Sequence, residues 1–255
     1  MSIIDLSHVS LTRQGKTILS DISFTLEAGD RLAVVGPNGA GKSFLLRLLS
    51  ADLIPSSGRI TLLGKTFGET NLWELRRRIG FVSTRLAFYY EGNVTVREVV
   101  ASGFAATFAL AEPLTVHQAA AVQTSLEFFQ LPALAERCFE TLSDGEKRKT
   151  LLARAIVEQP ELLIFDEPCQ GLDIPSRERF LADVERLAKT TPIVYVTHHV
   201  EELPMCINKV LFLRQGTMTA LGAPRSLLTS EELSALFEYP LAVQSHDGRY
   251  YIQHA

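Results

Sequence analysis

The segment GPNGAGKS, residues 36–43, constrains the fold of this chain more than any other. It follows the short apolar run RLAVV, and it leads into residues 42–53, where apolar residues repeat with the period of a helix. Two glycines with four residues between them allow successive backbone N–H groups to wrap around a phosphate. The pattern therefore predicts a phosphate-binding loop between a strand and a helix. In such a loop Lys42 reaches the β- and γ-phosphates and the Ser43 hydroxyl binds Mg²⁺.

Carboxylates follow a second apolar run, LLIF at residues 162–165. Asp166 and Glu167 come where a buried strand of a parallel sheet presents its ligand crevice. Asp166 is suited to hold Mg²⁺ through water, and Glu167 to activate a water as the general base of phosphoryl transfer. His198 follows another apolar run, residues 192–197, and can hydrogen-bond a γ-phosphate. The alternatives, a solvated acidic turn and a satisfied polar histidine, give neither residue a part in phosphate chemistry.

The segment TLSDGEKRK, residues 141–149, predicts a second helix start that suits an anion. Ser143 and Glu146 have the spacing of a capping box in front of an apolar run. The first backbone N–H groups of such a helix form its positive end. The chain thus carries two phosphate-seeking helix starts, and an ordinary capped helix is the alternative for the second one.

Strand and helix patterns alternate through the rest of the chain. Residues 3–11 and 18–26 alternate apolar and polar, which predicts half-buried strands of an antiparallel layer. From about residue 94 to 158 the pattern is mostly helical, and RRRIGFV, residues 76–82, reads as a basic turn that feeds a strand. Alternation interrupted by a helical stretch predicts a parallel α/β core with a helical subdomain.

Composition excludes several classes of protein. The net charge of −4 argues against broad electrostatic binding of nucleic acid. Three scattered cysteines predict reduced thiols in a cytosolic protein and not a disulfide framework. We expect no signal peptide, since residues 1–10 lack a basic start and a long apolar stretch, and no run approaches the ~18 apolar residues of a membrane span.

Taken together, these motifs resemble those of the ATP-binding cassette (ABC) ATPases, in family order and over residues ~1–225. GPNGAGKS resembles the Walker A motif, LLIFDE the Walker B motif, GLD the D-loop and the TH at 197–198 the switch histidine. LSDGE, residues 142–146, resembles the family signature LSGGQ, which other P-loop proteins lack.

The resemblance implies an α/β fold of the P-loop NTPase (RecA-like) class, with a parallel core, an N-terminal antiparallel β-subdomain and an inserted helical subdomain. It implies an ABC domain over residues 1–225, with β-subdomain and core at about 1–83 and 160–225. The helical subdomain falls at about 84–159, and residues 226–255 form a short C-terminal extension.

Site residues follow from the same resemblance, with ATP and Mg²⁺ as the cofactors. The catalytic residues are Glu167, His198 and Lys42, and the metal-binding residues are Ser43, Asp166 and, at a doubtful position, Thr84. The residues expected to bind ATP are Arg13, Gly36, Pro37, Asn38, Gly39, Ala40, Gly41, Lys42, Ser43 and Phe44. In the family two cassettes pair head to tail, so the signature residues Ser143, Asp144, Gly145 and Glu146 serve the partner's ATP. Gln170 and the D-loop Asp173 lie near the dimer seam.

Four positions depart from the family pattern. Arg13 stands where an aromatic residue stacks on adenine, and its guanidinium plane can also stack on a base. Phe44 replaces a hydroxyl residue that touches the α-phosphate, so its backbone N–H takes over that contact. Thr84 occupies the position of the Q-loop glutamine, which joins the core to the helical subdomain, and Thr84 is too short to span the same gap. Asp144 replaces a signature glycine and leaves the Gly145 contact in place.

The resemblance implies an ATP-hydrolysing subunit of an ABC transporter, paired with a second copy or a homologous cassette and attached to a separate membrane permease. We then expect the chain to be cytoplasmic, at the inner face of the membrane. The segments 86–93 and 99–113 flank the Q-loop side and offer a docking groove, with core packing as their alternative. A soluble ABC ATPase that remodels protein or nucleic-acid complexes remains the second interpretation, which Thr84 favours. A P-loop kinase is the third, and it leaves the signature unexplained.

Overall fold

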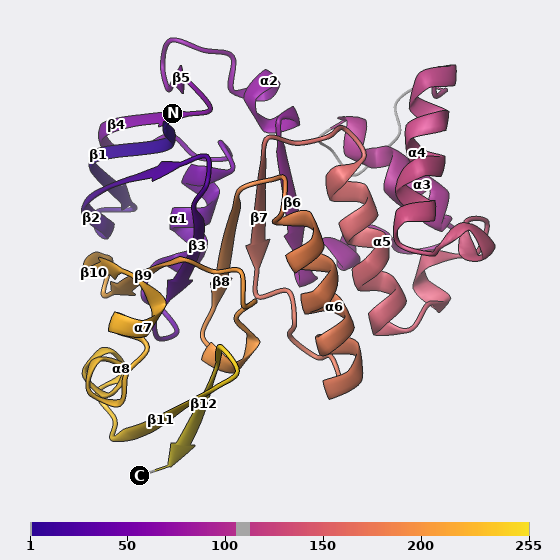
Figure 1. The fold of residues 1–255 in the computed structure, drawn as a ribbon. Helices are drawn as coiled ribbons and strands as arrows, with labels where there is room; N and C mark the ends of the chain where they lie inside the picture. The colour runs from indigo at the N-terminus through magenta and orange to yellow at the C-terminus, as the bar shows by residue number, and fades with distance from the viewer. Residues whose placement is uncertain (1, 106–112, 255) are drawn as a thin grey trace.

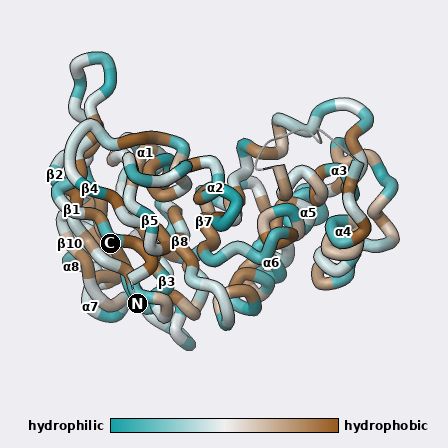
Figure 2. Tube along the Cα trace, turned by 90° about the horizontal axis from the view of Figure 1, so that it is seen from above, coloured by the Kyte–Doolittle hydropathy of each residue, from teal (hydrophilic) through white to brown (hydrophobic). Residues whose placement is uncertain are grey.

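The computed structural model describes residues 2–105 and 113–254 of the 255-residue chain. A central sheet separates an antiparallel β-layer from a group of helices (Figure 1). Seen from above, the β-layer and the helical part form two lobes on either side of the central strands (Figure 2). This arrangement confirms the predicted α/β architecture with an antiparallel subdomain and a helical subdomain.

The central sheet has six strands in the order β10-β9-β3-β8-β7-β6. All neighbours pair in parallel except β9 and β10, which form an antiparallel hairpin. The register aligns Ser83 with Asp166 and Val35 with Thr197, so the carboxyl ends of four strands meet at one edge. The bounds are β3 Arg31–Val35, β6 Ile79–Ser83, β7 Leu162–Asp166, β8 Ile193–Thr197, β9 Lys209–Arg214 and β10 Thr217–Gly222.

The antiparallel layer has the strand order β2-β1-β4-β5. Buried and exposed residues alternate over much of β1 and β2, because one face of the layer covers the core and the other meets solvent. Both strands were predicted from this alternation. The bounds are β1 Ser2–Arg13, β2 Lys16–Glu27, β4 Ser57–Leu62 and β5 Lys65–Thr66.

Between about residues 84 and 159, the stretch predicted as the helical subdomain, the described residues form three α-helices: α3 Val96–Ala101, α4 Val116–Phe128 and α5 Asp144–Ile156. Each begins at a capping box, with Thr95, Thr115 and Ser143 as the N-cap residues. The remaining helices are α1 Lys42–Leu49, α2 Leu72–Arg77, α6 Ile174–Leu187, α7 Pro224–Leu227 and α8 Ser230–Phe237. None of the described helices is long and apolar enough to cross a membrane.

The prediction of a basic turn at residues 76–82 was partly wrong. Arg76 and Arg77 lie in the last turn of α2, where cations interact favourably with the helix dipole. Asn71 starts this helix by accepting the Trp73 N–H at 3.0 Å. The strand predicted after the arginines is β6.

The core lies on both faces of the central sheet. Because side chains alternate along a strand, Ala33 and Val35 of β3 face the helical side, whereas Leu32 and Val34 face the antiparallel layer. The proposed C-terminal extension, residues 226–255, joins the first of these clusters through Leu233 and Leu236 of α8. The proposed boundary at residue 225 falls inside α7.

The last described residues form an antiparallel hairpin that the sequence did not predict. Strands β11 (Leu241–His246) and β12 (Arg249–His254) pair along their whole length. The hairpin lies below β8 and α6 in Figure 1.

Candidate nucleotide-binding site

The loop after β3 has a backbone that only glycine permits. A Cβ atom at Gly36 would lie 2.0 Å from the carbonyl oxygen of Leu213, which is impossible without a shift of β9. Gly41 has a φ of +103°, a conformation that side-chain-bearing residues rarely adopt. The loop therefore holds its tight curve because glycines stand at these two positions.

Lys42 begins α1 inside this loop and is 6% exposed. Its ammonium donates to the carbonyl oxygens of Gly36, at 2.7 Å, and Pro37, at 3.1 Å. Burial lowers the pKa of Lys42, and the charges of Glu167 and Asp166 oppose that change. No side chain caps the N-terminus of α1, so its first backbone N–H groups are suited to an anion.

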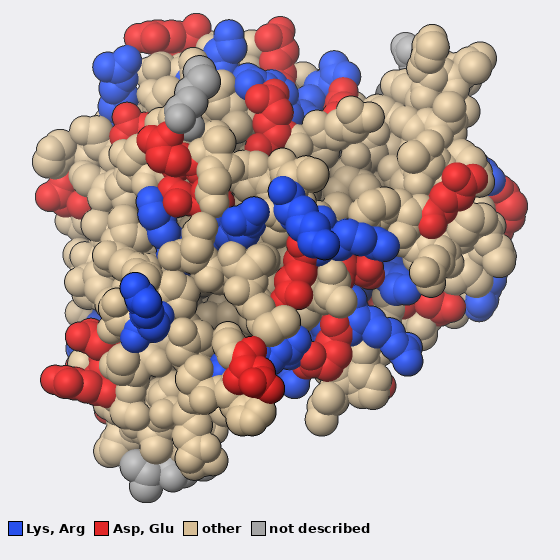
Figure 3. Space-filling model, in the orientation of Figure 1, with Lys and Arg blue, Asp and Glu red and all other residues tan. Residues whose placement is uncertain are grey.

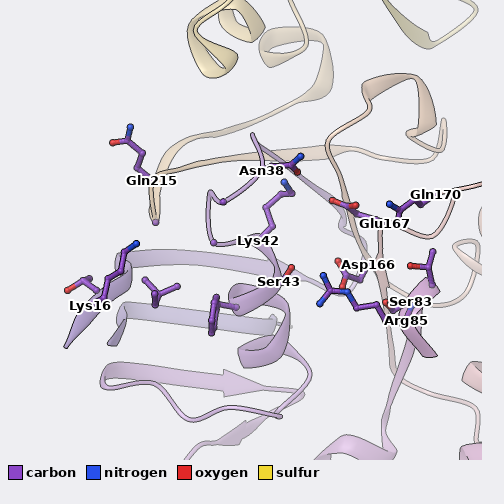
Figure 4. A pocket seen from close by; sticks show the side chains of 17 residues that line it. Lys16, Asn38, Lys42, Ser43, Ser83, Arg85, Asp166, Glu167, Gln170 and Gln215 are labelled. Carbon is purple, nitrogen blue, oxygen red and sulfur yellow. Dashed lines mark hydrogen bonds between the residues drawn. The ribbon is translucent and has the colours of Figure 1, made fainter. Parts of the chain in front are cut away.

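Two carboxylates follow β7 at the same edge of the sheet. Burial, followed by the neighbouring charge of Glu167, raises the pKa of Asp166, whereas Arg85 and Lys42 lower it. Glu167 has a φ of +45°, unusual for a residue with a side chain, and its N–H donates to the Val196 carbonyl at 2.9 Å. The two adjacent side chains thus occupy different positions at the mouth of the site (Figure 4).

Glu167 and His198 form a hydrogen-bonded pair, with Oε1 and Nδ1 2.9 Å apart. Both side chains are about three-quarters buried. The pair comes from the ends of two neighbouring strands, β7 and β8, as parallel pairing requires. The structure therefore brings together two residues that the sequence placed far apart.

A cavity of about 600 Å³ opens over the loop and the two carboxylates (Figure 4). Many of the predicted residues line it: Asn38, Gly39, Gly41, Lys42, Ser43, Phe44, Thr84, Asp166, Glu167 and Gln170. Seven further residues were not predicted: Lys16, Thr17, Ile18, Ser83, Arg85, Gln215 and Gly216. Gly36, Pro37, Ala40 and His198 are not among the lining residues, but the carbonyl oxygens of Gly36 and Pro37 contact Lys42, and His198 contacts Glu167.

Arg13, predicted to stack on adenine, is not among the described residues that line the cavity. It is exposed at the end of β1, where it pairs across the hairpin with Lys16. Lys16, Thr17 and Ile18 of β2 line this side instead, because the strand after the turn runs back toward the phosphate loop.

The chemistry of the donor set fits Mg²⁺. Ser43 supplies a hydroxyl and Asp166 a carboxylate to the same cavity, and Thr84 adds a second hydroxyl. Among the described residues no cluster of three or more His, Cys, Asp or Glu could hold a metal alone. Such a sparse set matches Mg²⁺, which is bound through one or two carboxylates together with substrate phosphates.

The second helix start has the predicted capping box. The Ser143 N–H and O–H donate to Glu146 Oε2 at 2.8 and 2.7 Å, and the Glu146 N–H donates back to Ser143 Oγ at 3.4 Å. None of the signature residues 143–146 is among those lining the cavity over Lys42. Asp144 instead lines a neighbouring cavity of about 510 Å³.

Arg148, which sequence reasoning missed, ties the signature helix to the carboxylate loop. Its buried guanidinium donates to the carbonyl oxygens of Pro168, at 2.9 Å, and Gln170, at 3.0 Å. The D-loop Asp173 caps α6 by accepting the Ser176 N–H at 2.8 Å. Arg148 could have been identified from the sequence only as a charged residue among the residues of α5 that are buried, such as Leu151 and Leu152.

Comparisons with known proteins agree with this geometry. The sequence pattern of the family described as ABC transporter matches residues 19–170, more than half of the chain. An uncharacterised ABC transporter ATP-binding protein of Bacillus subtilis, YlmA, is 39% identical over 99% of this chain and 97% of its own length. The chain belongs to the ABC transporter family.

Two further relatives place the cassette among transporters. The hemin import ATP-binding protein HmuV of Thermobifida fusca is 33% identical over 96% of this chain and 85% of its own length. A putative metal-chelate type ABC transporter, solved facing inward, superposes with a TM-score of 0.81 at 29% identity, covering 99% of this chain and 96% of that one. The ABC protein described here is thus an ATPase, and its function is that of the ATP-binding subunit of a transporter. The kinase and non-transport interpretations are thereby disfavoured.

Proposed function

We propose that two copies of this ABC subunit, or one copy and a homologous cassette, close head to tail around ATP and so drive a separate membrane permease. The observation that carries this proposal is the position of Ser143. Its helix start is exposed, and it is absent from the lining of the cavity over its own Lys42. A phosphate bound over Lys42 in one copy would present its outer face to the Ser143 helix start of the other.

Within one cavity the roles divide by chemistry. Lys42 and the N-terminus of α1 neutralise phosphate charge, and Ser43 and Asp166 hold Mg²⁺, which stabilises charge on the phosphates. Glu167 acts as the general base on the attacking water, and His198 holds the Glu167 carboxylate through the hydrogen bond at 2.9 Å. Hydrolysis removes the γ-phosphate that joins the two copies, so the dimer opens.

A groove of about 490 Å³ beside the helical subdomain is the proposed docking site for the permease. Leu86 and Tyr89 line it, and Phe88 and Tyr89 are 73% and 60% exposed. Ser83, Arg85 and Asp166 line both this groove and the nucleotide cavity. A docked segment would therefore touch residues that also face ATP. Part of the second segment predicted to dock, residues 106–112, lies outside the described residues.

The surface charge and the relatives extend the proposal. Acidic and basic side chains are interspersed on the face shown in Figure 3, a distribution that favours a protein partner over nucleic acid. We place the subunit at the cytoplasmic face of the membrane through its permease. Relatives named for hemin import and metal-chelate transport support a metal chelate as the transported class.

The dimer is tested with Glu167→Gln, which keeps the shape of the side chain and removes the base. With ATP and Mg²⁺ this variant should elute as a dimer in gel filtration with light scattering, and as a monomer without ATP. Adding Ser143→Arg should abolish the dimer while the affinity of the monomer for ATP stays near normal. Thr115→Arg, at the matched capping box of α4, is the control and should still dimerise. Loss of ATP binding in the Ser143→Arg variant would show that the residue serves its own cavity.

The docking groove is tested by co-purification. The tagged chain should recover a multi-span membrane protein from solubilised membranes, and Tyr89→Asp, a change at an exposed residue that lines the groove, should lose it while retaining ATPase activity. Recovery of soluble partners alone would contradict the transporter assignment of this groove.

A further inference from the structure

The turn that carries His198 is held by a hydroxyl and a carboxylate that no motif identifies. Thr197 is fully buried at the end of β8, and its Oγ1 accepts the His199 N–H at 3.0 Å. The same hydroxyl has two acceptors within reach, Glu202 Oε2 at 3.3 Å and the His199 carbonyl oxygen at 3.4 Å. The hydrogen bonds of Thr197 therefore join the turn that contains His198 to Glu202.

The Glu202 carboxylate is partly removed from solvent, which disfavours its charged form. It is half-buried at the end of the 3₁₀ helix η5 (Val200–Glu202). Burial raises the pKa of Glu202, whereas the charge of His199, the hydroxyl of Thr197 and the charges of Arg177 and His198 lower it. Burying a carboxylate is unfavourable unless hydrogen bonds and charges compensate for it. We therefore ask what Glu202 does at this position, in contact with the residue that precedes His198.

Arg177 approaches the same site from α6, the helix that begins after the D-loop Asp173. Its Nε is buried and, within residues 2–105 and 113–254, makes no hydrogen bond. It lies 3.5 Å from Glu178 Oε1, which is an ion-pair distance. Arg177 thus contributes positive charge to Glu202 without fixing the carboxylate in place, which leaves Thr197 as the group that orients it.

The C-terminal hairpin holds η5 and α6 from the outside. Glu201 accepts the Ile252 N–H at 3.4 Å, and the Arg249 guanidinium pairs with Glu178 at 2.5 Å. In η5, Glu201 contacts the hairpin and the next residue, Glu202, contacts Thr197. In α6, Glu178 contacts the hairpin and the preceding residue, Arg177, interacts electrostatically with Glu202. The hairpin therefore contacts both η5 and α6, the elements that carry Glu202 and Arg177.

We propose that Glu202 is the positioning residue of His198, acting through Thr197 to hold the imidazole against Glu167. This inference rests on the proposed function, in which His198 supports the base Glu167. Without Glu202 the Thr197 hydroxyl keeps only the His199 carbonyl oxygen, 3.4 Å away and within the same turn, as its acceptor. The turn then loses its link to η5 and relaxes, and the contact between Nδ1 of His198 and the Glu167 carboxylate is no longer maintained.

The test is a double-mutant cycle on Mg²⁺-ATPase activity with Glu202→Ala, His198→Ala and the combined variant. A hydrogen bond to a charged group is worth enough to change kcat by about tenfold, with the KM for ATP unchanged. Since Glu202 acts through His198, the combined variant should be no slower than His198→Ala alone. Glu202→Gln retains an acceptor for Thr197 and should keep most of the activity.

Glu185→Ala is the matched control, because this carboxylate also supports a loop, by accepting the Met205 N–H at 2.8 Å, but it does not contact the turn of His198. Its kcat should stay near that of the wild type. Thermal midpoints and ATP affinities of all variants establish that they fold and bind. Three results would each overturn the inference. They are a combined variant whose loss of kcat equals the product of the two single losses, an inactive Glu202→Gln, and a His198→Ala variant with unimpaired kcat. A folded wild-type chain that binds but does not hydrolyse ATP would overturn the proposed function as well.

Discussion

Ser143 caps helix α5 and, in the proposed dimer, binds the phosphate held by the partner. Replacing Ser143 by alanine separates these two roles, because the chain contains a matched control. Ser143 and Thr115 head helices of the same subdomain, and each donates from its N–H and its hydroxyl to the third residue of its helix. In both boxes the backbone N–H of that third residue returns a bond to the hydroxyl, at 3.4 Å for Ser143 and 3.3 Å for Thr115. Ser143→Ala and Thr115→Ala therefore remove the same local contacts.

The two variants should lose similar stability. An N-cap Ser or Thr replaced by alanine lowers the free energy of unfolding by ~1 kcal/mol. For a chain of this size that loss corresponds to a fall of ~2 °C in the thermal midpoint. Differential scanning fluorimetry without nucleotide measures both shifts.

Catalysis should differ between them. If Ser143 Oγ binds the partner's phosphate, its removal deletes a hydrogen bond to a charged group, worth ~1.5–3 kcal/mol, and lowers kcat by about tenfold or more. Thr115→Ala should leave kcat within about twofold, since uncapping α4 touches no phosphate. Steady-state ATPase assays at protein concentrations above and below the dimerisation midpoint measure this difference. Equal effects of the two substitutions on kcat would refute the role of Ser143, and an effect on ATP affinity of the monomer would place Ser143 in its own cavity.

Two further substitutions test the nucleotide site. Asp166→Asn should stabilise the nucleotide-free fold by ~1 kcal/mol at neutral pH, as relief of a strained functional site does, while weakening Mg²⁺-dependent ATP binding. The sign follows from linkage: burial raises the pKa of Asp166 in the folded protein, so its ionised form opposes folding, and the wild type gains stability as pH falls toward that pKa. Chemical denaturation at several pH values should therefore show a smaller advantage of Asp166→Asn at acidic pH, and an advantage that grows with acidity would contradict the burial argument. Gly36→Ala should cost ~1–3 kcal/mol of stability through its clash with Leu213, whereas Gly29→Ala, where a Cβ meets nothing within 4 Å, should change stability by less than ~0.5 kcal/mol.

Local patterns predicted most of the elements because local physics decides them. The alternation in β1 and β2, the apolar run of β7 and the capping residues of α5 each reflect interactions within a few residues of sequence. The phosphate loop was predicted from its glycines, because the backbone at Gly36 and Gly41 leaves no room for a side chain or adopts a φ that favours glycine.

The features that the sequence did not reveal depend on distant contacts. Arg13 was assigned by its position in the family pattern, and its contact with a base stays a prediction; the structure adds that Lys16, Thr17 and Ile18 of β2 line the cavity and that Arg13 does not. Arg148 was missed because its partners are backbone carbonyls of a loop that follows another strand. The C-terminal hairpin was missed because its short strands are supported by packing against the distant core, through Leu241, Val243, Tyr250 and Ile252, and by contacts with α6 and η5.

The sequence by itself determined which groups this protein offers to a phosphate: a glycine loop with Lys42, a carboxylate pair after a buried strand, and the capped helix start at Ser143. Only the tertiary structure decided which of them share a cavity. Parallel pairing carries Asp166, Glu167 and His198 to one edge, and it leaves Ser143 outside the cavity over Lys42. The reason is that hydrogen-bond register between distant strands, and not any property of the local segment, fixes where each strand ends.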